Sequence, residues 1–142
     1  MISVSMAISK LLREDSGVTD LLASYNNLPA IFPGRAPDNA ASLFPRIEIW
    51  SVNKDLRLIG SPLVQVSVRI DENNTGVAEA SADQIAIEVL RVLDGYQGVV
   101  LDETQGVAVN ACAYEQGGQC IVDDGGRLFF PMTFRLQTNR VL

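Results

Sequence analysis

Residues 64–70 alternate strictly between aliphatic and polar side chains, and no other pattern in the chain constrains its fold as strongly. The aliphatic members of the run are Val64, Val66, Val68 and Ile70. Because successive side chains of a β-strand point to opposite faces, the run predicts a strand with one apolar and one polar face. The apolar face needs a second layer to cover it, and the rest of the chain must supply that layer.

The longest helical pattern follows this strand and predicts a helix over Val77–Leu93. Apolar side chains recur at spacings of four and three residues, which gives the helix one apolar face. They are Ala78, Ala82, Ile85, Val89 and Val92. Asp94-Gly95 is typical of a helix end. Two further helices are predicted over Ile2–Glu14 and Val18–Ser24.

Strand patterns account for most of the remaining apolar residues. They cover Arg46–Val52, Gly98–Leu101, Val107–Tyr114 and Leu128–Thr138. The first of these is expected to form a hairpin with residues 64–70, and Pro131 in the last implies an edge position or a bulge because proline cannot donate to a neighbour. Strands grouped around one long helix predict an α+β fold, with an antiparallel or mixed β-sheet packed by helices on one face.

Length and composition favour a single α+β domain over residues 1–142, since apolar residues make up 47% and charged residues 20%. Residues 26–45 contain four prolines but enough large apolar side chains to form an ordered connection. No apolar run reaches the ~18 residues of a membrane helix, and no signal-peptide pattern is present. A cytoplasmic protein without a membrane partner is therefore expected, and free thiols at Cys112 and Cys120 are favoured over a disulfide.

Charge is distributed unevenly along the chain, whose net charge is −6. Residues 71–126 carry eleven acids and one arginine, whereas residues 127–142 carry three arginines and no acid. No basic patch of the kind that binds phosphate is evident, so no specific nucleic-acid binding is predicted. The acidic stretch is either a solvated face that keeps the protein soluble or a surface that meets a basic partner.

The chain contains no histidine, which removes the commonest general base and the commonest metal ligand. No nucleophile elbow, P-loop or dinucleotide-binding glycine pattern occurs. We therefore predict no catalytic residue, no cofactor, no metal and no enzymatic activity.

Two acidic segments come closest to a chemical site. Residues 71–76 begin like a calcium loop with Asp71, but the twelfth position is Ala82 instead of the chelating glutamate. Asp123 and Asp124 are followed by two glycines, a combination more typical of an exposed turn than of an acid/base pair. Both segments are interpreted as turns.

Five residues are candidates for a protein interface. Leu56, Leu58 and Ile59, with Arg57 among them, lie in the loop of the predicted hairpin. They either tuck under the sheet or form an exposed apolar patch of the kind that marks partner interfaces. Trp50 is either buried under a loop or helix, or is a contact residue on the polar face of its strand.

The order of these segments resembles the tail-terminator, or tail-completion, proteins of long-tailed bacteriophages and prophages. The resemblance rests on the N-terminal helix pair ending at Asp20-Leu21-Leu22, the proline-rich segment 31–37, the strand entry at 44–49, the helix ending near 93–95 and the strand 129–136. It implies an α+β structural protein that forms a ring, usually a hexamer, at the head-proximal end of the tail tube. Its partners are then further copies of itself and a tail-tube or head-connector protein.

The resemblance also implies assembly in the host cytoplasm and a place in the virion tail of an active phage. A closed ring needs two different patches that meet head to tail, and segregated charge would suit that pairing. The alternative is a small cytosolic binding domain or a weak hydrolase that uses carboxylates such as Asp71, Asp123 and Asp124.

Overall fold

The structure, a computed structural model, describes residues 2–52, 62–70, 75–102, 107–117, 119–122 and 127–140. Its helices are α1 (Ile2–Arg13), α2 (Ser16–Thr19), α3 (Thr75–Leu93) and a 3-10 turn, η1 (Asp38–Ala40). Its strands are β1 (Ser24–Tyr25), β2 (Leu28–Pro29), β3 (Ile31–Pro33), β4 (Arg46–Ser51), β5 (Leu63–Ile70), β6 (Tyr96–Asp102), β7 (Val107–Gly117), β8 (Ile121–Val122) and β9 (Leu128–Arg140).

The main sheet has seven strands in the order β3–β4–β5–β9–β7–β6, with β8 paired to β9. β3 runs parallel to β4, and the other neighbours in this sheet are antiparallel. A mixed sheet with helices packed on it confirms the predicted α+β class. The predicted pairing of the strands at 46–52 and 64–70 is present as β4 against β5.

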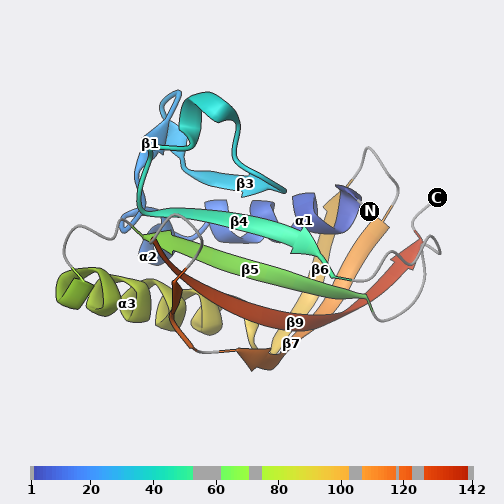
Figure 1. Ribbon diagram of the computed structural model, residues 1–142. Helices are drawn as coiled ribbons and strands as arrows, with labels where there is room; N and C mark the ends of the chain where they lie inside the picture. The colour runs from blue at the N-terminus through green and yellow to red at the C-terminus, as the bar shows by residue number, and fades with distance from the viewer. Residues whose placement is uncertain are drawn as a thin grey trace.

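α1 and α3 contact each other and lie against the same face of the sheet (Figure 1). α1 contacts β3 and β4 at one end of the sheet and β6 and β7 at the other, while α3 contacts β5, β9 and β7. The sheet therefore curls around α1 (Figure 1). We call the face that carries the helices the inner face and the opposite one the outer face. No helix in the described part of the chain is long and apolar enough to cross a membrane.

The core lies between the inner face and these two helices. In register, Val66 of β5 stands between Ile49 of β4 and Met132 of β9, and all three are fully buried. Each such side chain contributes roughly 1.5–3 kcal/mol when it leaves water. The helices fill the other side of this core with Val4, Ile8, Leu12, Val18, Ile85, Val89 and Leu93.

The second predicted helix, Val18–Ser24, is wrong in position. The side chain of Asp15 accepts a hydrogen bond from the Val18 backbone N–H at 3.2 Å, which starts α2 at Ser16. The chain leaves the helix after Thr19 because Ala23 donates its N–H to the Pro45 carbonyl and accepts from Ala30. These long-range backbone bonds outweigh the local helical pattern.

Residues 26–45 contain more regular structure than the predicted winding connection. β1 and β2 form a short hairpin around Asn26 and Asn27, whose φ values of 52° and 66° suit the tight turns that asparagine tolerates. Three residues, Ile31–Pro33, then add a parallel strand at the edge of the main sheet. The prolines of this segment disfavoured a strand, so the sequence pattern did not predict it.

Pro131 lies in an interior strand, so the edge position is wrong for it. β9 pairs with β5 along one side, where Pro131 is opposite Ser67. Along its other side the neighbour changes from β7, whose pairing ends at Met132, to β8, whose pairing starts at Phe129. β7 also carries a register shift between Tyr114 and Gln116, so a bulge does lie close to the proline.

The packing of α1 inside the curled sheet should contribute much of the free energy of folding. Replacing the fully buried Leu12 with alanine is expected to lower the free energy of unfolding by about 2–5 kcal/mol, because it leaves a cavity under the sheet. Leu28→Ala, at an exposed site, is the matched control and should change it by less than about 0.5 kcal/mol. Urea titration followed by circular dichroism measures both, and equal losses would contradict this packing.

Cys112 should resist alkylation in the folded protein. Burial, with a contribution from nearby Asp94, raises the pKa of the Cys112 thiol to about 12, so little reactive thiolate exists at pH 8. No disulfide joins it to Cys120. Mass spectrometry after iodoacetamide treatment should find Cys112 unmodified in native protein and modified in urea; rapid native labelling would show that β7 opens readily.

Candidate functional site

The outer face of the sheet divides into a covered end and an open part. The covered end is at β3 and β4, where residues 34–45 pack on Phe32 and bond Glu48 and Arg46. Phe32 packs there in a small second cluster with Ala30, Ala36 and Ala40. This segment shields the outer-face side chains beneath it from water.

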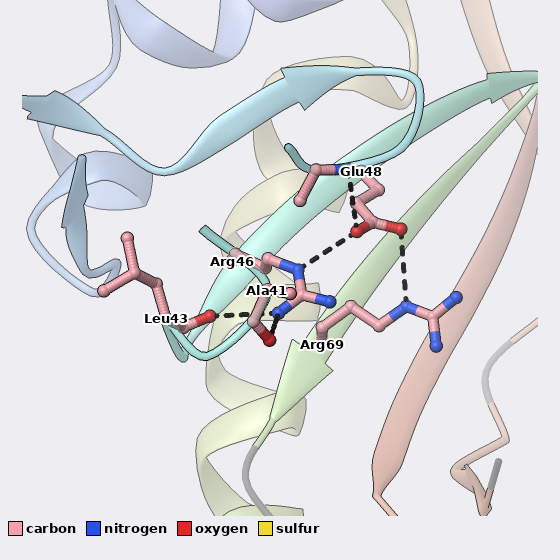
Figure 2. A network of polar contacts seen from close by, with 6 residues as sticks. Ala41, Leu43, Arg46, Glu48 and Arg69 are labelled. Carbon is pink, nitrogen blue, oxygen red and sulfur yellow. Dashed lines mark hydrogen bonds and ion pairs between the residues drawn. The ribbon is translucent and has the colours of Figure 1, made fainter. Parts of the chain in front are cut away.

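Glu48 is the main consequence of that cover, since it faces outward on β4 yet is only 3% exposed. Its Oε2 atom accepts from Arg46 Nε at 3.0 Å and from the Ala36 backbone N–H at 3.2 Å (Figure 2). Its Oε1 atom lies 3.6 Å from Arg69 Nε, on the neighbouring strand β5. One carboxylate therefore joins two strands to the covering segment.

Arg46 extends the network into that segment. Its Nη1 atom donates to the carbonyls of Ala41 at 2.9 Å and Leu43 at 3.2 Å, as Figure 2 shows. Its guanidinium also lies 4.7 Å from the centre of the Phe44 ring. Guanidinium and carboxylate each gain several partners here, which offsets the cost of removing both charges from water.

Aromatic rings align two more arginines along this end of the outer face. Arg127 lies 5.0 Å from the Phe44 ring centre, and Arg69 lies 4.5 Å from that of Phe129. Such cation–π contacts hold guanidinium groups against the sheet surface. Arg46, Arg69 and Arg127 gather here with Glu48, and these four side chains together carry a charge of +2.

The open part of the outer face is neutral and partly apolar. Trp50 is 38% exposed, and Gln65 lies opposite it in register. Beside them is a shallow hollow of about 340 Å³. Its lining includes Gln65, Gln116, Gln119, Ile121, Pro131 and Thr133. Val52, which follows β4, and Ile121 of β8 are also exposed, which makes this an apolar surface with amide and hydroxyl groups between its exposed side chains.

The opposite side of the molecule presents the polar side of α3. Arg91 there donates to Asp15 at 2.6 Å and to Glu88 at 2.7 Å, and so ties α3 to the start of α2. The hydrogen bond from Arg91 lowers the pKa of Asp15 below its ordinary value. Asp83 is also exposed, and the four side chains of Asp15, Asp83, Glu88 and Arg91 together carry a charge of −2.

Glu48 is occupied by two arginines, and the described residues contain no group of three or more potential ligands that could hold a metal ion. The acids considered for chemistry, Asp71, Asp123 and Asp124, lie outside the described residues.

Of the five predicted interface residues, the structure places one. Trp50 lies on the outer face and is exposed, whereas Leu56, Arg57, Leu58 and Ile59 lie outside the described residues. Sequence reasoning missed the Glu48 network. Its signal was an acid two residues from Arg46 on the same strand face, but the partner Arg69 becomes visible only once β4 and β5 are in register.

Comparison with known proteins gives a result at the level of fold. Neither a scan against protein-family models nor a search of the curated proteins finds a match. A search of solved structures finds a similar chain in a structure described as the virion of a native gene transfer agent particle. The two chains share a fold. The TM-score is 0.67 at 13% sequence identity, and the alignment covers 96% of this chain and 94% of the other.

The Glu48 network gives a prediction about stability. Glu48→Gln removes the charge that neutralises Arg46, whose side chain is only 11% exposed, and should lower the free energy of unfolding by about 3 kcal/mol. The matched control is Glu115→Gln in the exposed ion pair with Arg135, for which less than about 1 kcal/mol is expected. Urea titration compares the two, and similar small losses would mean that Glu48 does not hold residues 34–45 in place.

Proposed function

We propose that this chain is a structural assembly protein of a phage-like particle and acts as a tail terminator. Several copies, usually six, form a ring at the head-proximal end of the tail tube, where the ring stops tube growth and offers a surface to the head connector. The observation that carries this proposal is the fold shared along nearly the whole length of both chains with a chain of a gene transfer agent virion.

Two properties of the surface support an assembly role. The open outer face carries exposed Trp50 and Val52, and tryptophan is over-represented among residues that dominate interface energies. The most thoroughly buried acid among the described residues, Glu48, is held by arginines and is not available as a base. A hydrolase built on carboxylates would need the acids at 71, 123 and 124 to converge, and it remains the alternative.

The proposal is tested by tube growth in vitro. The tail-tube protein encoded by the same genome is polymerised with and without this chain, and tube lengths are measured by electron microscopy. We expect shorter tubes, each with a cap of about six copies at one end only. Thermally unfolded chain is the control. Unchanged tube lengths and no protein at the ends would contradict the proposal.

A further inference from the structure

Two exposed apolar patches lie on opposite sides of the molecule. The first is the neutral hollow on the outer face beside Trp50. The second is centred on Ile87, which is 64% exposed on the solvent side of α3, although the helix buries Ile85 and Val89 on its other side. Ile87 is the one large hydrophobic side chain exposed on the described part of α3, and acidic residues lie on either side of it.

The side of α3 around Ile87 and the sheet face that carries the hollow differ in the sign of their charged groups. Asp83 lies one helical turn before Ile87, and Glu88 directly follows Ile87; with Asp15 and Arg91 they carry a charge of −2. The hollow shares the outer face with Arg69, which stands four positions after Gln65 along β5, and with exposed Arg127. Complementary charge beside apolar contact is the usual arrangement of a specific protein interface.

We propose that α3 of one copy docks on the outer face of a second copy, with Ile87 seated in the hollow beside Trp50. The acidic side of α3 then faces Arg69 of β5 and Arg127, which directly precedes β9. Because the helix side and the sheet side are different surfaces, the contact is heterologous, and repeating it generates a closed ring or an open chain. This inference rests on the proposed ring and names the surfaces that close it.

Site-directed cross-linking tests the contact directly. In a Cys120→Ser background, one protein carries Ile87→Cys and a second, distinguishable by a tag, carries Thr133→Cys in the hollow. Cys112 stays in both because it is buried in the core. A short thiol-reactive bifunctional linker is added to the mixture, and denaturing gels measure the cross-linked heterodimer.

We expect the mixed pair to give at least about tenfold more cross-linked dimer than either protein alone, since only the pair brings the two positions together. The matched control replaces Ile87→Cys by Lys10→Cys, at an exposed position of α1 away from both patches. A yield from the mixed pair no higher than that control overturns the proposal, whether or not the wild-type chain forms larger oligomers.

A second substitution separates docking from chance collision. Trp50→Asp in the Thr133→Cys protein should lower the yield about tenfold or more, whereas Trp50→Phe should retain most of it. Trp50 is exposed, so neither change should alter the melting temperature much, and circular dichroism checks this. If Trp50→Asp leaves the yield of cross-linked dimer unchanged, the proposal is overturned.

The cross-linking experiment and the tube-growth assay can fail independently of each other. Capped tubes without cross-linking would leave the terminator function standing and place the contact between copies elsewhere. Cross-linking without capping would establish the contact between copies and remove the tail role.

Discussion

The packing of one apolar sheet face around α1 is the interaction on which the rest of the structure depends. α1 reaches both ends of the sheet, so strands far apart in the order β3 to β6 are held by the same helix. Burying Ile8 and Leu12 therefore fixes the curl of the sheet as well as the position of the helix. Once the inner face is occupied, the outer face is the side of the sheet left for contacts outside this core.

The outer face is not uniform, because residues 34–45 cover only one end of it. Over that end, the segment turns Glu48 and Arg46 from surface residues into a buried ion pair with a backbone partner at Ala36. The remaining area keeps its tryptophan, glutamines and threonine at the surface. This segment thus divides the face into a covered, charged end and an open, neutral part.

Much of the fold was predictable, because the decisive patterns are local. Alternation at 64–70 and the spacing of apolar residues over 77–93 identify a strand and a helix whose burial the structure confirms at Val66, Val68, Ile85 and Val89. Errors occur where distant backbone partners decide the conformation. Ala23 leaves its helical pattern to bond Pro45 and Ala30, and β3 exists only because β4 lies beside it.

The candidate surface was harder to predict for the same reason. Trp50 was identifiable as an outward residue by alternation alone, but the hollow beside it is assembled from β5, β7, β8, β9 and the residues between them. No sequence pattern singles out Gln65, Gln116 and Thr133. They come together only once the strands are paired in register. At 13% identity, the similarity to the virion chain is likewise one of arrangement, which sequence patterns do not record.

The place of β9 has a consequence for how the chain reaches this structure. β9 pairs with β5, β7 and β8, so it occupies the middle of the sheet although it is synthesised after all of them. Until β9 is synthesised, β5 and β7 each lack the neighbour that joins them in the final sheet. Folding must therefore bring together segments that are far apart in the sequence before β9 can pair with both neighbours. Chains with such long-range pairing typically fold slowly and benefit from chaperones during synthesis.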